Sequence, residues 1–122
     1  MTFNEYQAKA STTAMYLNKI KELNPDLSEN IQSILGLSYA SLGLGEAGEV
    51  QGKVKKIIRD AGGNITDDVK KEISKELGDI LWYISAMCGE LGIEMDYVAE
   101  QNIEKLFSRK ERGVITGSGD NR

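Results

Sequence analysis

The sequence predicts an all-α fold, and three observations support this prediction. Apolar residues recur at three- and four-residue intervals over most of the chain, and no segment shows the strict alternation of a half-buried strand. The breaks between these segments carry residues that end or start helices, namely proline, paired glycines and a threonine before acidic residues. With 122 residues the chain has the size of one domain, for which oligomerisation would add stability.

The first half of the chain is expected to form two helices. The first covers about Thr2–Leu23 and ends at Asn24-Pro25-Asp26, because the proline ring disfavours helical geometry in the preceding residue. The second runs from Ser28 or Ile31 to Asp60 and ends at a glycine-rich segment, residues 61–64. This second helix allows an interruption at Gly36, Gly43, Gly45 or Gly48, because glycine weakens a helix by about 1 kcal/mol relative to alanine.

The second half is expected to form two more helices and a tail. Thr66 caps a helix that runs to about Leu91 and is broken by Gly92. The last helix spans roughly Met95–Lys110. Residues 1–112 therefore form the helical domain, and residues 113–122 form a Gly/Ser-rich C-terminal tail, either an ordered loop or a mobile arm.

The helix that ends at Leu91 has two distinct stripes. One stripe is apolar at 3.6-residue spacing and contains Ile73, Leu77, Ile80, Ile84, Met87 and Leu91. The other, about 90° around the helix, contains Glu72, Glu76, Asp79 and Tyr83, so the acids are expected beside the core, in a crevice between helices. Residues 80–87 are apolar nearly all round, which suggests that a partner subunit covers this helix.

Charge and composition exclude several classes of protein. The net charge of −4 and the pI near 4.9 argue against nucleic-acid binding. No apolar run is long enough for a membrane span, and the N-terminus lacks the apolar run of a signal peptide, so a cytoplasmic location is expected. The chain has no histidine and one cysteine, Cys88, which is expected to be a small buried hydrophobe.

The available metal ligands are therefore oxygens. A zinc site of the usual ligand set is excluded, and Mg²⁺, Mn²⁺ or Ca²⁺ is favoured. The lack of histidine also excludes the common catalytic triads and the commonest general base.

Two acidic pairs with i, i+3 spacing are candidates for such a site. Each pair puts two carboxylates on one helix face, and antiparallel neighbouring helices would bring all four together. Four such carboxylates repel one another and need a cation, which can also hold phosphates. The pairs are Glu46 with Glu49 and Glu76 with Asp79.

Context, not spacing, distinguishes these two pairs. Asp26 and Glu29 have the same spacing, so the spacing alone does not identify a site. The first candidate pair is flanked by Gly45 and Gly48, which would let another helix or a ligand approach closely.

Longer motifs resemble the MazG-like nucleotide pyrophosphohydrolases of the all-α NTP pyrophosphatase superfamily. Their signature is E-x-x-E followed at a distance by E-x-x-D. Residues 43–50, GLGEAGEV, and 75–83, KELGDILWY, match its two halves, which are separated by 26 residues, Val50–Lys75. Residues 102–109, NIEKLFSR, resemble the downstream N-x-x-K-L-x-x-R element. The GSGDNR ending and the Tyr-Gln pair at residues 6–7 extend the resemblance over about residues 3–122.

The resemblance implies an activity and a fold. The activity is hydrolysis of a nucleoside triphosphate, deoxy or non-standard, between the α- and β-phosphates, giving a monophosphate and pyrophosphate. The fold is a four-helix bundle completed by dimerisation, as a homodimer or homotetramer. The catalytic, Mg²⁺-binding residues, with Mn²⁺ as a substitute, would be Glu46, Glu49, Glu76 and Asp79. Glu49 is the preferred general base and Glu46 the alternative.

Five further residues are candidates for substrate binding. Lys53 is expected at the phosphates, or alternatively in an i, i+4 pair with Glu49. Tyr83, one turn beyond the acids, could stack on the base, whereas Trp82 is assigned to the core or to an interface. The resemblance to the N-x-x-K-L-x-x-R element implies that three residues of the last helix contact the phosphates or the sugar, namely Asn102, Lys105 and Arg109.

Other functions stay open at this point. Within the superfamily these are a dUTPase- or dCTPase-like enzyme and a phosphoribosyl-ATP pyrophosphatase. Outside it, the chain could be a non-enzymatic helical binding module with solvated acids or a structural Ca²⁺ site. The Ca²⁺ version is disfavoured because no D-x-D-x-D-G loop is present.

Overall fold

The computed structural model describes residues 1–122 and contains helices but no strands, which confirms the all-α prediction. No helix is both long enough and apolar enough to pass through a bilayer. In chain order the elements are α1 (Phe3–Ser11), α2 (Tyr16–Leu23), α3 (Glu29–Gly43), the 3₁₀ turn η1 (Leu44–Glu46), α4 (Ala47–Asp60), α5 (Asp67–Leu91) and α6 (Met95–Glu111).

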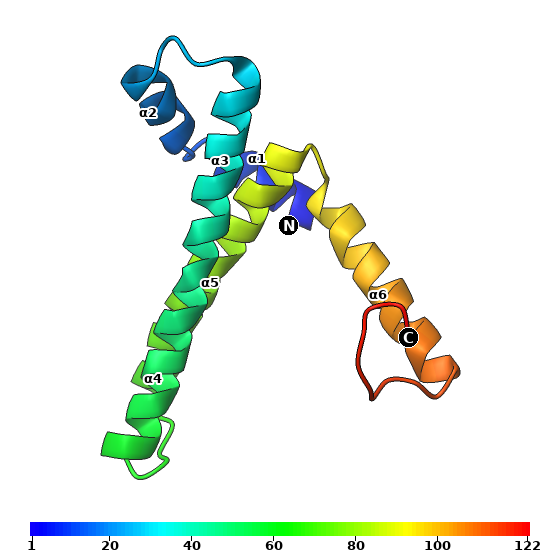
Figure 1. Cartoon of the computed structure of the whole chain (residues 1–122). Coiled ribbons are helices and arrows are strands. Elements are labelled where there is room, and N and C mark those ends of the chain that lie inside the picture. Colours follow the sequence, from blue (N-terminus) through cyan, green and yellow to red (C-terminus); the bar gives the residue numbers. More distant parts are fainter.

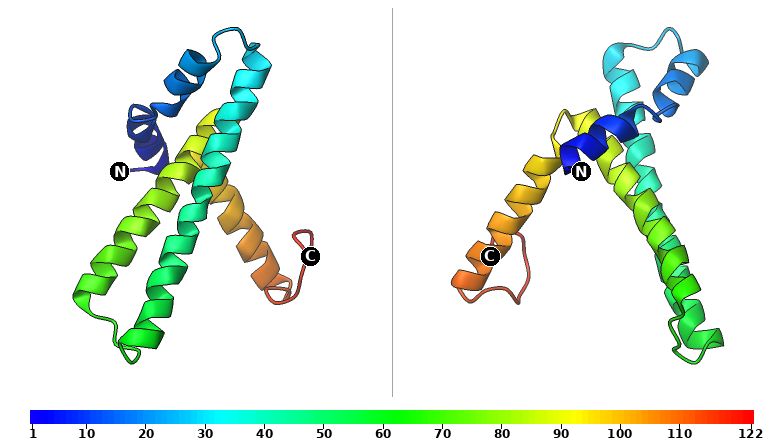
Figure 2. Two further views of the ribbon diagram at one scale, coloured as in Figure 1. Left: turned by 60° about the vertical axis from the view of Figure 1, so that its left-hand side comes forward. Right: turned by 180° about the vertical axis from the view of Figure 1, so that it is seen from behind.

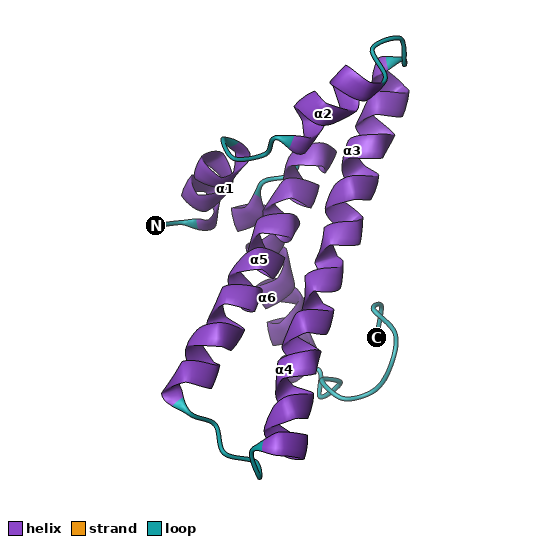
Figure 3. Ribbon diagram, turned by 90° about the vertical axis from the view of Figure 1, so that its left-hand side faces the viewer, coloured by secondary structure: helices purple, strands orange, loops and turns teal.

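The helices form two arms that meet at an angle. In the longer arm, α3, η1 and α4 follow one another as one rod, and α5 runs back along it (Figure 1, Figure 3). The other arm is α6, which departs from the end of α5 (Figure 2). Helix α1 crosses α5 near the apex, and α2 packs on α3.

The prediction of one helix over Thr2–Leu23 is wrong, because the segment is divided at residues 12–15. The hydroxyls of Ser11, Thr12 and Thr13 each donate to the backbone carbonyl three residues earlier, at 2.7–2.8 Å. Such side-chain bonds compete with the helical ladder. The consecutive hydroxyl residues therefore end α1, and α2 starts in a new direction.

The other expected boundaries are confirmed within about one residue. The interruption allowed among the glycines is the 3₁₀ turn η1. Thr66 caps α5 by accepting a hydrogen bond from the Val69 amide at 3.2 Å. Gly92 ends α5 with φ of +66°, a conformation in which glycine is strongly favoured.

Hydrogen bonds from α1 fix the direction of α6. Asp96 accepts from the amides of Phe3 and Asn4 at 3.0 and 3.3 Å, and Asn4 accepts from the Asp96 amide at 3.0 Å. The Gln7 amide group donates to the Ile93 carbonyl at 2.9 Å and accepts from the Met95 amide at 3.0 Å. The junction between α5 and α6 is therefore braced rather than free.

The chain buries little apolar surface on its own. Eight of its 122 residues are buried, among them Cys88, as predicted, and burial raises the pKa of that thiol. Leu77, Ile84 and Leu91, here called the α5 stripe, are 53%, 36% and 53% exposed. The chain's own helices thus leave the predicted apolar side of α5 largely uncovered.

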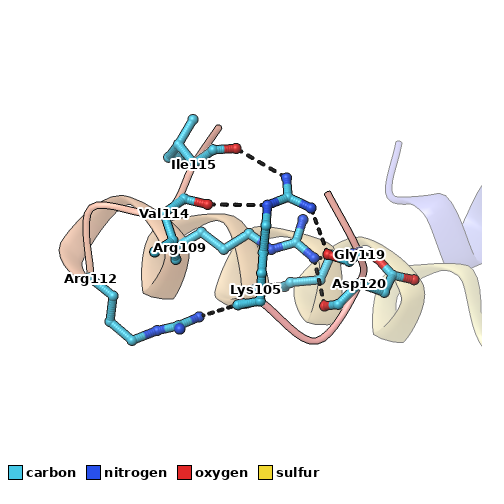
Figure 4. A network of polar contacts seen from close by, with 8 residues as sticks. Lys105, Arg109, Arg112, Val114, Ile115, Gly119 and Asp120 are labelled. Atoms are coloured by element: carbon cyan, nitrogen blue, oxygen red, sulfur yellow. Dashed lines mark hydrogen bonds and ion pairs between the residues drawn. The ribbon is translucent and has the colours of Figure 1, made fainter. Parts of the chain in front are cut away.

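The C-terminal segment, residues 113–122, folds back on α6 as a loop braced by three arginines (Figure 4). Arg122 donates to the backbone carbonyls of residues 114, 115 and 119, and Arg112 donates to the Arg122 carbonyl. Arg109, buried under the loop, donates to the carbonyl of Asp120 at 2.7 Å and to its carboxylate at 3.3 Å. This segment is an ordered loop and not an extended arm.

Replacing Asp120 by asparagine is expected to loosen this loop. Hydrogen bonding from Arg109 and the nearby charge of Lys105 lower the pKa of Asp120. A lowered pKa means that this stabilisation is complete above the ordinary value of 3.8 and is lost as pH falls through the folded-state pKa. At pH 7 the variant should show faster amide exchange in residues 113–122 and unchanged exchange in α5. Equal exchange in both proteins would contradict this role.

Candidate functional site

Three carboxylates converge where η1 packs against α5. Oxygen atoms of Glu46, Glu76 and Asp79 all lie within 4.8 Å of one another. The turn η1 presents Glu46 to α5, on which Glu76 and Asp79 are one helical turn apart. Glu46 and Glu76 are half-buried and Asp79 is exposed, so the cluster is open to solvent on one side.

Glu49, the fourth predicted carboxylate, lies outside this cluster. It is exposed in the first turn of α4. No atom lies within 4 Å of a Cβ built at Gly45 or Gly48, so these glycines leave open space and are not covered by another helix. Within the chain, the close approaches that glycine permits occur instead at Gly43, against Tyr83, and at Gly36, against Glu90.

One lysine partly balances the charge of the cluster. Lys53 lies 3.4 Å from Glu76 and 3.7 Å from Glu72, both on α5. The alternative interpretation, a pair between Lys53 and Glu49 on the same helix, is therefore not what the structure shows. Glu46 and Asp79 form no ion pair, so three carboxylates and one ammonium leave two negative charges unbalanced. Such a set of oxygens suits a hard divalent cation.

Aromatic rings lie beside the acids. The Tyr83 ring packs against the Gly43 backbone, with its centroid 6.5 Å from that of Tyr39 and 5.0 Å from that of Trp82. The pKa of Tyr83 is raised by burial first, then by Tyr39 and by the charges of Glu46 and Asp79. The Tyr83 ring is thus positioned next to the carboxylates, as the sequence predicted.

Replacing Gly43 by alanine is expected to displace Tyr83. A Cβ at this position would overlap the Tyr83 ring, although the helical backbone of Gly43 otherwise accepts alanine. Overpacking of this kind costs about 1–3 kcal/mol. The matched control is Gly45→Ala, whose Cβ meets nothing within 4 Å. Urea unfolding should show a loss of stability for Gly43→Ala only; equal stability of both variants would contradict the packing.

Tyr6 lies close enough to the acids for the charge of Asp79 to act on it, although the sequence analysis placed it only in the family resemblance. The pKa of Tyr6 is raised by burial first and then by the charge of Asp79, because α1 packs on α5 beside the acids. Its position on the apolar side of α1 resembles that of a core residue. The sequence offers no separate signal for its proximity to Asp79, which depends on how α1 crosses α5.

The predicted binding residues of α6 lie away from the acids of the same chain. Asn102 is exposed and lines a groove between α5 and α6. Lys105 and Arg109 both contact Asp120, at 3.4 and 3.3 Å. These residues lie on the α6 arm, which diverges from the arm that carries the acids (Figure 1).

Comparisons with known proteins agree with the motifs. The model of the MazG nucleotide pyrophosphohydrolase domain matches residues 36–114, which include the acids and all of α6. Gene 37 protein of Mycobacterium phage L5 is 46% identical over 118 residues, which cover 96% of each chain. No solved structure matches.

Proposed function

The chain belongs to the MazG nucleotide pyrophosphohydrolase family, and from this membership we propose that it hydrolyses a nucleoside triphosphate between the α- and β-phosphates. The products would be a (deoxy)nucleoside monophosphate and pyrophosphate. The observation that carries the proposal is the convergence of Glu46, Glu76 and Asp79 with unbalanced negative charge. We expect the enzyme to act on nucleotide pools in the cytoplasm.

The three clustered carboxylates would hold Mg²⁺, with Mn²⁺ as a substitute. The donor set fits, because it contains only oxygen atoms, within 4.8 Å of one another, and is accessible from solvent. When bound, the cation supplies charge for the phosphates and lowers the pKa of a bound water. Glu49, exposed one turn after Glu46, would join this set or act beside it.

Hydrolysis requires a base for the attacking water. As the water oxygen bonds to the α-phosphorus, the bond from this phosphorus to the bridging oxygen breaks and pyrophosphate leaves. The water's proton passes to a carboxylate, and Glu49 is the preferred acceptor because it lies outside the cluster; Glu46 is the alternative. Lys53, now paired with Glu72 and Glu76, would turn its ammonium toward the phosphates.

We also propose that a second copy of the chain completes the fold. The α5 stripe is exposed, and the groove beside it is lined almost entirely by apolar residues of α1, α5 and α6. This surface suits another amphipathic helix pair better than water. Because Lys105 lies on the arm that diverges from the acids of its own chain, it would contribute to catalysis in the partner's site.

A panel of nucleotides with product identification tests the proposal. The purified protein with Mg²⁺ is incubated with each common deoxynucleoside and ribonucleoside triphosphate and with phosphoribosyl-ATP. Release of pyrophosphate and the monophosphate supports the proposal, and the preferred nucleotide separates dUTPase-, dCTPase- and phosphoribosyl-ATP-specific enzymes. Release of orthophosphate as the first product would contradict cleavage between the α- and β-phosphates, and no turnover of any of these nucleotides would favour a non-enzymatic module.

A further inference from the structure

A second site is suggested by a cavity of about 310 Å³ between α1, α2 and α5. Apolar surface from Ala10, Leu17 and Trp82 lines most of it, and Gln7, Ser85 and Glu90 are among its polar residues. Its volume lies at the lower end of the range for small-molecule sites, which suits a nucleobase with its sugar.

The cavity begins one turn beyond the acids. Trp82 follows Asp79 by three residues on α5, and Glu90 at the far end lies about 12 Å further along the helix axis at 1.5 Å per residue. On α1, Tyr6 lies near Asp79 while its neighbour Gln7 lines the cavity. A nucleotide with its phosphates at the acids would therefore have its base within reach of the cavity.

Most hydrogen-bonding groups around the cavity already have partners in the chain. The Trp82 indole N–H donates to Thr13 at 2.8 Å, and both ends of the Gln7 amide bond the backbone. Ser11 donates its hydroxyl proton to the Ala8 carbonyl at 2.8 Å, which leaves its oxygen as an acceptor. The charged group that faces the cavity is the Glu90 carboxylate.

Glu90 is held in place from two sides. The Tyr16 hydroxyl donates to one carboxylate oxygen at 2.5 Å. The other oxygen lies against Gly36, where any added Cβ would be only 2.7 Å away. Since a carboxylate oxygen accepts more than one hydrogen bond, Glu90 presents fixed acceptors and no donor to a ligand.

We propose that this cavity takes the nucleobase and that Glu90 selects bases that carry an amino group. The amino groups of guanine, adenine and cytosine donate to a carboxylate. Thymine and uracil instead flank their single N–H with two carbonyl oxygens, which repel the carboxylate. The selection of substrate rests on the proposed function, but the binding of the base does not require hydrolysis.

Fluorescence of Trp82 tests base binding without metal or turnover. Trp82 is the chain's single tryptophan and lines the cavity, so an occupying base should quench it. The probes are the deoxynucleoside monophosphates of guanine, adenine, cytosine, thymine and uracil. Because a hydrogen bond to a charged group contributes about 10- to 100-fold, the three amino-bearing monophosphates should bind tighter than the other two by that factor.

Two variants assign the preference to Glu90. Glu90→Gln, which adds a donor at the same size, should reduce the preference to about threefold or less. Gly36→Ala, which keeps the carboxylate but displaces it, should also reduce the preference. Glu22→Gln removes the same charge from an exposed position on α2 and should leave it unchanged.

The outcomes separate this inference from the proposed function. Equal binding of all five monophosphates, no quenching by any of them, or an unchanged preference in Glu90→Gln would overturn the inference. Each of these results is compatible with hydrolysis of triphosphates. Conversely, selective binding without hydrolysis of any triphosphate would leave the inference standing and remove the proposed function.

Discussion

Replacing Glu76 by glutamine is expected to lower Mg²⁺-dependent hydrolysis by at least about 100-fold. Glu76 lies within 4.8 Å of both Glu46 and Asp79 and is the half-buried carboxylate that pairs with Lys53. Loss of its charge weakens cation binding and leaves Lys53 paired with Glu72 alone. Metal-assisted stabilisation supplies several kcal/mol, and each 1.4 kcal/mol corresponds to about tenfold in rate.

Glu72→Gln is the matched control for this prediction. Glu72 is on the same helix, one turn earlier, and also pairs with Lys53, but it is not part of the three-carboxylate cluster. Its turnover should stay within about threefold of the wild type, because an exposed ion pair contributes little. A thermal shift with Mg²⁺ gives a second measurement, which should be retained in Glu72→Gln and lost in Glu76→Gln. Equal turnover and equal shifts in the two variants would refute the assignment of the cluster.

The sequence predicted the positions of most helices because their signals are local. The apolar period, the Thr66 cap and the Gly92 stop each depend on a few neighbouring residues, and the structure confirms them. The break in the first helix was missed, although its cause is also local. Three consecutive hydroxyl side chains at residues 11–13 donate to backbone carbonyls of the preceding turn and compete with the helical hydrogen bonds. The spacing of apolar residues does not reveal this competition.

The site was only partly predictable, because its geometry depends on how helices are joined. Glu46 closes a 3₁₀ turn and Glu49 belongs to the first turn of the α-helix after it. Both kinds of turn keep residues i and i+3 on roughly the same side, so the spacing does not show which member of the pair reaches the acids of α5. Three carboxylates converge within the chain, and Glu49 lies to one side.

The direction of α6 depends on contacts that no local pattern shows. Asn4 and Asp96 are 92 residues apart in the chain, yet their reciprocal hydrogen bonds help to set the angle at which α6 leaves α5. That angle keeps Lys105 and Arg109 away from the acids of the same chain (Figure 2). The motif on α6 could be found from the sequence, but its separation from the acids could not.

Replacing Ile84 by glutamate is expected to convert an oligomer into monomers. Ile84 is the middle residue of the α5 stripe and lines the groove between α5 and α6. In a twofold interface it is buried twice, once from each subunit. Ile84 is 36% exposed in the single chain, so its burial in the interface contributes about a third of the 1.5–3 kcal/mol of a fully exposed isoleucine. Desolvation of the two introduced carboxylates costs several kcal/mol more, and together these effects weaken the dimer by at least about 10²-fold.

Sedimentation velocity of the wild type, Ile84→Glu and Leu23→Glu measures this effect. Leu23 is 79% exposed at the end of α2, away from the α5 stripe, so its variant should sediment like the wild type. Because Lys105 lies on the arm remote from the acids of its own chain, the monomeric variant should also lose turnover. A monomeric wild type would refute the twofold interface, because the α5 stripe would then be exposed to solvent in the native protein. A fully active monomer would instead show that α6 contributes nothing across the subunit boundary.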